Sequence, residues 1–314
     1  MALSARMPDL ASLELLLVIA RTGSLSAAGR ELGLTQQAVS ARLAGLEART
    51  GIRLAVRTTR GAVLTPAGTV LAGWADRLLQ AAHEVDTGIA SLRADAQGRM
   101  RIAASLTIAE QLLPGWLVTL RAQARRQGKE PIEVVLQATN SDTVVDQVRT
   151  GDADLGFIEG SGTPRGLRSR VVAHDELVLV VLPDHRWARR SSGVTAEELN
   201  DTPLVTREAG SGTREFLATA LRSRLGAGTR QSKPALELST TASVRAAVLA
   251  GAGPAVLSRL AVTDDLRGER LRHVAVIDLD LRRELRAIWD GPRTPPAGAV
   301  RAFLAHLGAR TAPR

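Results

Sequence analysis

Cysteine is absent from the 314 residues of this chain, and so are the segments that direct a protein into or across a membrane. Without cysteine there is no disulfide, no thiol nucleophile and no cysteine-ligated metal, although the absence leaves the redox compartment open. The amino terminus lacks the basic region, apolar run and small-residue cleavage site of a signal peptide. No apolar stretch is long enough to span a bilayer. We therefore expect a cytoplasmic protein with no membrane partner.

Motifs for catalysis and for metal or cofactor binding are missing as well. The five histidines are too scattered for a metal motif, and no Gly-x-Ser-x-Gly nucleophile elbow occurs. Asp152 and Asp154 could share a divalent metal, but a turn aspartate explains them more simply. The glycine-rich run from Gly210 to Thr213 lacks the lysine and the spacing of a P-loop. The sequence predicts a protein that is not an enzyme and has neither cofactor nor metal.

The charge of the chain is unbalanced. Lysine and arginine together number 41 against 32 acidic residues, and the net charge of +9 suits a polyanionic partner. Nearly all of these basic residues are arginine, which, with the abundant alanine and glycine, can reflect codon bias alone. A hydrophobic content of 45% over this length is enough for two or more domains with sizeable cores.

Three helical patterns follow one another near the amino terminus, interrupted at Gly23 and Gly33. Each pattern has an apolar face that must pack inward, so three helices can close a small core. Thr35 is placed to cap the third helix. The apolar positions of the three patterns are, in chain order, Leu13, Leu16, Leu17 and Ala20; Ala27, Ala28 and Leu32; and Val39, Leu43 and Leu46.

The other side of the third helix carries polar side chains that can reach base edges and phosphates in a major groove. After it, arginines alternate with apolar residues around Gly61, which predicts a two-stranded wing whose arginines bind phosphates or a narrow minor groove. This is the layout of a helix-turn-helix, although a three-helix bundle with solvated arginines is the alternative. The candidate DNA-binding residues are Thr35, Gln36, Gln37, Ser40, Arg42, Arg53, Arg57 and Arg60.

A long helix is predicted over residues 66–96, after the winged region at residues 1–65. Pro66 suits its first turn, and apolar residues recur every seventh position, which is typical of a coiled-coil seam. A helix of this length spans about 45 Å, so pairing with a second copy would hold two DNA-reading heads at a fixed separation. Packing against the downstream domain is the alternative. The candidate dimerisation residues are Leu71, Trp74, Leu78, Val85 and Leu92.

From residue 97 to residue 314, short apolar runs alternate with helical segments, which predicts an α/β domain. Strands are expected at residues 100–104, 132–137, 153–158, 171–173, 177–182, 204–206, 255–257 and 274–277. We expect lobe I at residues 97–162 and 273–314 and lobe II at residues 163–272. Crossings near residues 159–170 and 268–276 would leave a cleft between the lobes that can hold a small molecule.

Hydroxyl and amide side chains gather at four predicted junctions between a strand and the next helix. Ligands in open α/β sheets bind at such strand ends, and helix amino termini attract anions. The glycine-flanked turn from Ser211 to Arg214 exposes backbone N–H groups, and Arg214 or Arg207 could neutralise an anion. Ordinary helix capping is the alternative for each junction. The candidate effector residues are Ser105, Thr107, Asn140, Thr206, Ser211, Thr213, Arg214 and Thr240.

The run TGSLSAAGRELGLTQQAVSARLAGLEARTGIRLAVRTTRGAVLTPAG, from Thr22 to Gly68, resembles the LysR-type transcriptional regulators. The resemblance implies a winged helix-turn-helix, a long linker helix and an effector domain shaped like a periplasmic binding protein, and all 314 residues fit this plan. It implies that the candidate hydroxyl and amide residues face a small organic acid or other polar metabolite. The stretch from Ser105 to Trp116 resembles members associated with sulfur and small-oxyanion metabolism.

The fold class that follows is α/β, with an amino-terminal all-α winged helix-turn-helix, a long linker helix and a two-lobed effector domain. The predicted function is transcription regulation, in which a homo-oligomer, dimer or tetramer, binds double-stranded promoter DNA and responds to a small anionic metabolite. RNA polymerase is a further partner that the resemblance allows. The alternative is a cytoplasmic small-molecule binding protein whose basic head aids solubility or contacts another protein.

Overall fold

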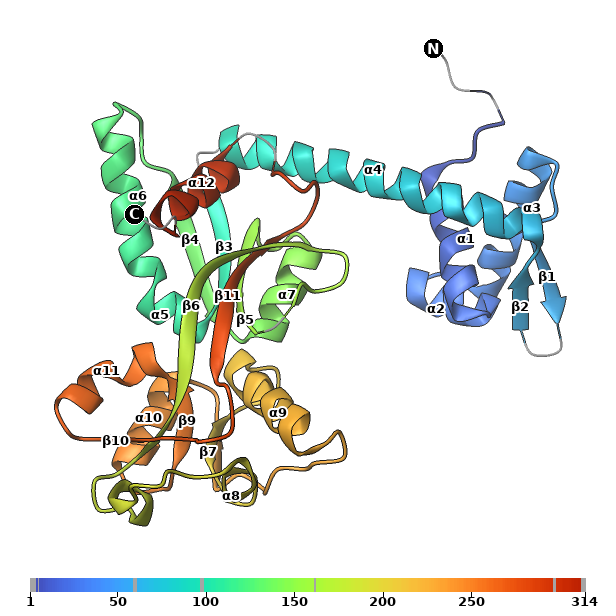
Figure 1. Cartoon of the computed structure of the whole chain (residues 1–314). Helices are drawn as coiled ribbons and strands as arrows, with labels where there is room; N and C mark the ends of the chain where they lie inside the picture. Colours follow the sequence, from blue (N-terminus) through green and yellow to red (C-terminus); the bar gives the residue numbers. More distant parts are fainter. Residues whose placement is uncertain are drawn as a thin grey trace. The chain divides into compact units, whose positions relative to one another are not determined.

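A computed structural model describes residues 4, 6–58, 61–96, 99–160, 162–295 and 298–311 (Figure 1). The chain divides into two compact units, Met1–Thr87 and Gly88–Arg314, which are described separately below. In the part of the chain that the structure describes, no helix combines the length and the apolar content needed to cross a membrane.

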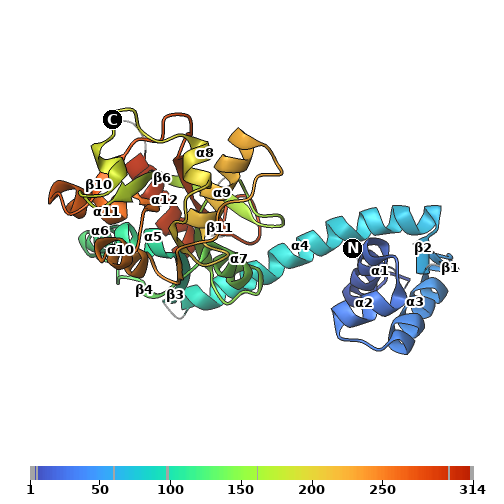
Figure 2. The same cartoon turned by 90° about the horizontal axis from the view of Figure 1, so that it is seen from below.

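Three helices build the core of the amino-terminal unit (Figure 2): α1 (Leu10–Thr22), α2 (Leu25–Leu32) and α3 (Gln36–Thr50). The Thr35 hydroxyl accepts from the backbone N–H of Ala38 at 3.2 Å, which confirms the predicted cap of α3. Val39, Leu43 and Leu46 are buried as predicted. Ala20 is exposed, contrary to the prediction. The buried residues of α1 lie on other sides of the helix, where Leu15 and Ile19 pack in one core and Leu16 packs in another.

The predicted wing is present as two antiparallel strands, β1 (Ala55–Thr58) and β2 (Gly61–Leu64). Ala55 and Ala62 point into the core, whereas the paired valines Val56 and Val63 are exposed. The backbone N–H of Ala62 donates to the carbonyl oxygen of Gly23 at 2.8 Å, so the wing is attached to the turn between α1 and α2.

The long helix α4 (Pro66–Ala96) begins as predicted. The Thr65 hydroxyl accepts from the backbone N–H of Gly68 at 2.9 Å, and Ala72 and Ala75 are buried. Gly68 lies so close to β1 that a Cβ there would be 2.0 Å from the carbonyl oxygen of Leu54. The first turns of α4 are therefore part of the amino-terminal unit's own packing.

The second unit begins with a sheet in which β3 (Arg99–Ser105) pairs in parallel with β4 (Glu133–Thr139) and with β5 (Leu155–Glu159). Both faces of this sheet are covered around β3 and β5, which are largely buried, whereas the edge strand β4 is largely exposed. Trp116 of α6 (Leu113–Arg126) and Phe303 of α12 (Ala299–Thr311) pack on one face. Val144 and Val148 of α7 (Ser141–Arg149) pack on the other, and the short α5 (Leu106–Gln111) follows β3.

The second lobe has two small sheets. In one, β9 (Ala255–Ser258) and β10 (Arg272–Val274) pair with the distal half of β6 (Arg168–Val181); in the other, β7 (Val205–Arg207) pairs with β8 (Leu236–Leu238). Its longer helices are α9 (Gly212–Leu225), α10 (Thr241–Leu249) and α11 (Arg259–Arg267). Two short helices complete it, η1 (Arg186–Arg189) and α8 (Ala196–Asn200).

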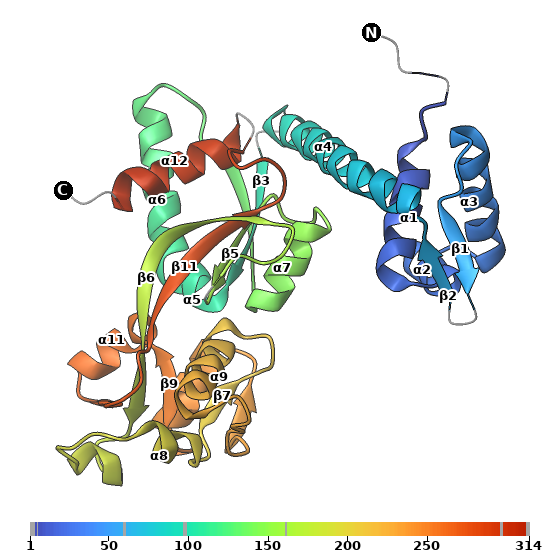
Figure 3. The same ribbon diagram turned by 45° about the vertical axis from the view of Figure 1, so that its right-hand side comes forward.

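Two long antiparallel strands connect the lobes, β6 and β11 (Arg282–Trp289), and run side by side from one lobe to the other (Figure 3). In β6, Val172 packs in the first core and Leu177 in the second. The predicted crossings near residues 159–170 and 268–276 are therefore misplaced. Residues 274–277 do not return to the first lobe, because Val274 pairs with Leu179 in the second. Strand β11 was not predicted.

Candidate functional site

The first candidate surface is the exposed side of α3. Gln36, Gln37 and Arg42 are exposed, as predicted, but they do not form one face. Successive residues of a helix are about 100° apart, which places Ser40 and Arg42 on opposite flanks. Gln36 lies on the flank of Ser40, where its side-chain oxygen accepts from the Ser26 hydroxyl at 2.9 Å.

The flank with Ser40 faces the wing. A cavity of about 430 Å³ separates α3 from β1 and β2, and Ser40, Glu47 and Arg53 line it. The Glu47 carboxylate accepts from the backbone N–H groups of Leu54 and Ala55 at 2.7 and 3.2 Å. Glu47 therefore holds the start of the wing against α3.

The flank with Arg42 faces the start of α1. Arg42 lines a second cavity, together with Asp9 and Arg49. Between the two flanks, the most exposed part of α3 has small residues, Ala41, Ala44 and Gly45. Side chains this small permit close approach to the floor of a groove, a feature that was not predicted from the sequence.

Three arginines were predicted to contact DNA from the wing. Arg53 is exposed just before β1. Arg57 belongs to β1, but its side chain is outside the described part of the structure, and Arg60 lies outside the described residues.

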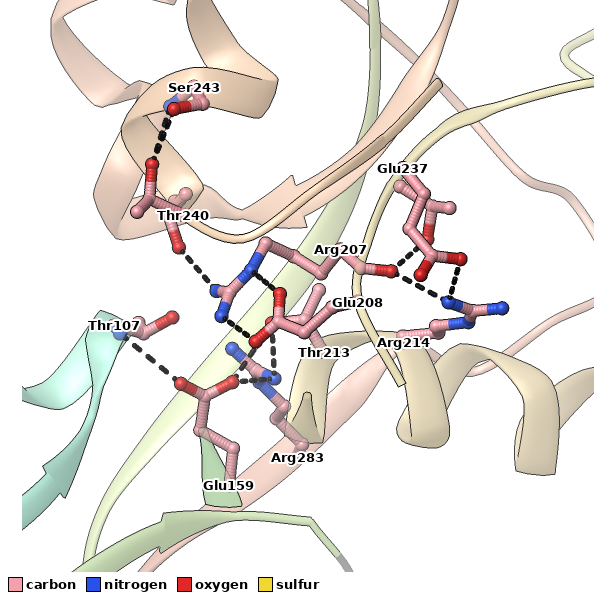
Figure 4. A network of polar contacts seen from close by, with 12 residues as sticks. Thr107, Glu159, Arg207, Glu208, Thr213, Arg214, Glu237, Thr240, Ser243 and Arg283 are labelled. Atoms are coloured by element: carbon pink, nitrogen blue, oxygen red, sulfur yellow. Dashed lines mark hydrogen bonds and ion pairs between the residues drawn. The ribbon is translucent and has the colours of Figure 1, made fainter. Parts of the chain in front are cut away.

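The second candidate site lies where the two lobes of the second unit meet, at the starts of α9 and α10, beside Thr213 and Thr240 in Figure 4. The backbone N–H of Asp142 donates to the carbonyl oxygen of Gly210 at 3.3 Å. A Cβ on Gly212 would be 2.6 Å from the Ser141 hydroxyl. The starts of α7 in one lobe and α9 in the other are therefore in direct contact.

A buried carboxylate lies at this contact. Glu159, at the end of β5, accepts from the Thr213 hydroxyl at 2.9 Å and from the backbone N–H of Thr107 at 3.3 Å. Arg283 of β11 donates to Glu159 at 2.6 Å and to Asp175 of β6 at 2.7 Å. Burial raises the pKa of Glu159, but the Arg283 charge and the hydrogen bonds outweigh it and hold the pKa below its ordinary value.

A second buried arginine lies at the end of β7. Arg207 donates to both carboxylate oxygens of Glu208 at 2.8 Å and to the Thr241 hydroxyl, at the start of α10, at 3.0 Å. In the other lobe, burial raises the pKa of Glu110 in α5, while the charge of Arg207 opposes this and that of Glu159 adds to it. Groups from both lobes therefore share one electrostatic environment.

The predicted effector residues separate into three groups. Ser105, Thr107, Ser211 and Thr213 are buried at the helix starts. Asn140 and Thr240 cap α7 and α10 through the backbone N–H groups of Thr143 and Ser243, as the capping alternative proposed.

Thr206 and Arg214 lie elsewhere, lining a side cavity of about 370 Å³ in the second lobe. There Arg214 donates to Glu237 at 2.6 Å and to the carbonyl oxygen of Arg207 at 3.0 Å. Of the two arginines that were candidates to neutralise an anion, Arg207 is buried at the helix starts and Arg214 lines this side cavity.

Four charged residues of this site were not predicted from the sequence: Glu159, Asp175, Glu208 and Arg283. Each of them is a charged residue within or beside an apolar run. Without knowledge of its partner, such a residue is predicted to lie in a solvent-exposed turn. Within the described ranges, no cluster of carboxylate and imidazole groups is arranged to hold a metal ion.

Comparisons with known proteins cover both units. The LysR substrate binding domain matches residues 93–312, and the bacterial regulatory helix-turn-helix of the lysR family matches residues 10–69. The HTH-type transcriptional regulator Rv2282c of Mycobacterium tuberculosis is 59% identical over 311 residues, which is 99% of this chain and 100% of that protein.

Two solved structures are similar in fold. The regulatory domain of CcmR from Synechocystis PCC6803, in complex with 2-PG, is 23% identical with a TM-score of 0.57, and the match covers 68% of this chain and 97% of that one. Full-length CbnR, complexed with its target DNA, is 20% identical with a TM-score of 0.50, and the match covers 96% and 99%.

Proposed function

The chain belongs to the LysR family of transcriptional regulators, and we propose that it binds promoter DNA in the cytoplasm as a homo-oligomer under the control of a small anion. The observation that carries the proposal is the buried pair of arginines in the cleft, Arg207 and Arg283, beside the helix starts. Buried guanidinium groups and helix amino termini both stabilise negative charge.

DNA binding is proposed through α3 and the wing. Gln36 and Gln37 stand at the exposed amino-terminal end of α3, the part of a recognition helix that contacts base edges. Arg42 on one flank and Arg53 on the other suit the two phosphate backbones that border a major groove. The target DNA bound by CbnR, which has the same fold, supports this reading.

Oligomerisation is proposed through α4. Trp74 and Val85, two of the seam residues, are 58% and 62% exposed in the single chain. Leu71 differs, because it packs partly against the amino-terminal core. Leu92 has a side chain outside the described part of the structure. Apolar side chains at this spacing on a solvent-exposed helix favour a coiled coil with a second copy.

The DNA-binding proposal is tested by fluorescence anisotropy on a labelled fragment from upstream of the coding region and on a scrambled fragment, each at two salt concentrations. We expect Gln37→Ala to reduce the preference for the specific fragment about tenfold, since a bidentate base contact contributes roughly 1–3 kcal/mol of discrimination. Arg53→Ala should weaken binding to both fragments and lower the salt slope by about one.

The matched control is Arg125→Ala, which removes one exposed positive charge from α6 of the other unit. It should leave both affinities unchanged. Equal losses from all three variants would contradict the assigned surface. Failure of the wild-type chain to bind any DNA in dilute buffer would favour the alternative, a small-molecule binding protein.

A further inference from the structure

The guanidinium group of Arg207 already donates the hydrogen bonds that an arginine would donate to a bound anion. Its Nε and Nη2 donate to the two oxygens of one carboxylate, that of Glu208, both at 2.8 Å. Nη1 donates to the Thr241 hydroxyl at 3.0 Å. A planar fork against two oxygens is the geometry by which arginine recognises carboxylates and oxyanions. An external anion can therefore reach this fork only by replacing Glu208.

The two cleft arginines differ in whether their carboxylate partners can leave. The side chains of Arg283, Glu159 and Asp175 are 0%, 3% and 1% exposed, so separating any of them would leave a buried charge unpaired. The side chain of Glu208 is 24% exposed, whereas that of Arg207 is 4% exposed. Glu208 can therefore turn into water while Arg207 stays in place.

We propose, resting on the proposed function, that Glu208 is an internal substitute for the effector. In the free protein its carboxylate occupies the fork of Arg207. A small anion that presents two oxygens, either a carboxylate or a tetrahedral oxyanion, displaces it and adds its charge next to the start of α10. Glu208 thereby sets the affinity, because every effector must compete with a carboxylate attached to the next residue of the chain.

The test compares the wild-type full-length chain with Glu208→Gln. Sodium sulfate and sodium acetate are titrated separately by calorimetry, with the ionic strength held constant by sodium chloride. We expect Glu208→Gln to bind one of the two anions at least about tenfold more tightly, because the competing carboxylate is gone while the arginine remains. A larger gain with sulfate assigns a tetrahedral oxyanion, and a larger gain with acetate assigns a carboxylate.

Two further variants control the test. Glu237→Gln removes the carboxylate from Arg214, in the side cavity, and should bind both anions as the wild-type chain does. The double variant Arg207→Gln/Glu208→Gln leaves a neutral amide pair of similar size and should lose the gain. Thermal unfolding of each variant with and without the anion shows whether it is folded, and we expect the anion to stabilise Glu208→Gln most.

The outcomes separate this inference from the proposed function. If the anions bind the wild-type chain through Arg207 and Glu208→Gln gives no gain, the role of Glu208 is wrong and the anionic effector stands. An equal gain in Glu237→Gln also overturns it, because the effect would then follow net charge alone. If no variant binds either anion, both the anionic effector and the role of Glu208 are wrong.

Discussion

Individual buried charges decide how the lobes of the second unit meet. Arg283 comes from β11, Asp175 from β6 and Glu159 from β5, and the Thr213 hydroxyl of α9 completes the group from the second lobe. Ser258 adds a hydrogen bond to Asp175 at 2.9 Å. Because each charge is paired, the cost of burying it is offset only while all partners are in place.

We predict that Arg283→Met destabilises the second unit by about 3–5 kcal/mol, since it leaves two buried carboxylates without their shared partner. The measurement is the free energy of unfolding in urea. The neighbouring Arg282→Met is the matched control, because that side chain is 78% exposed and pairs with the exposed Asp280. Its effect should be much smaller, because an exposed ion pair contributes little to stability. Similar losses in the two variants would contradict the importance of burial.

Among the elements, α4 has two distinct parts. Its first turns are held by close packing of Gly68, Ala72 and Ala75 against the amino-terminal unit. Trp74, on another side of the same turns, and Val85, further along the helix, expose apolar surface along the predicted seam. A single helix cannot bury such an apolar stripe, whereas packing against a partner helix would bury it and stabilise both helices.

We predict that Val85→Glu weakens self-association about 100-fold, because a carboxylate in the seam would be buried without a partner. Sedimentation over a range of concentrations measures this. Gln80→Glu adds the same charge at an exposed position of α4 away from the seam and should leave the assembly unchanged. Unaltered association of Val85→Glu would place the dimer contact elsewhere.

For the whole molecule, paired carboxylates link stability to pH. The pKa of Asp280 is lowered from 3.8 to about 2 by hydrogen bonds from Arg282. Hydrogen bonds also lower the pKa of Asp9, through Ser12, and that of Glu198, through Arg190. A carboxylate with a lowered pKa contributes stability above its unfolded pKa and loses that contribution as the pH falls through the folded pKa.

We therefore predict that the urea midpoint decreases slightly below about pH 7, because burial lowers the pKa of His185 and His273, and falls steeply between about pH 4.5 and 2. Glu110, whose pKa is raised by burial, acts in the opposite sense, because its ionisation costs stability as the pH rises. In 1 M salt, the exposed ion pairs should contribute less to this pH dependence, whereas the contribution of the buried Glu159 should be preserved. A urea midpoint that is higher at pH 3 than at pH 5 would contradict this prediction.

Local patterns determined much of the molecule from the sequence alone. The three amino-terminal helices, the Thr35 cap, the wing and the start of α4 depend on residues within a few turns of one another, so spacing and capping chemistry were enough to predict them. The buried strands β3 and β5 were recognised for the same reason. The dense motif from Thr22 to Gly68 also indicated the family, which the matches over both units establish.

Tertiary structure alone decided the rest. Strand β11 was missed because Arg283 reads as a solvent-exposed residue until Glu159 and Asp175, more than a hundred residues away, are brought to it. For the same reason the sequence favoured Arg214 as the cleft cation, whereas the fold turns Arg214 toward Glu237 and buries Arg207 at the helix starts. Whether a charge is solvated or paired depends on partners distant in sequence, and only the folded chain brings those partners together.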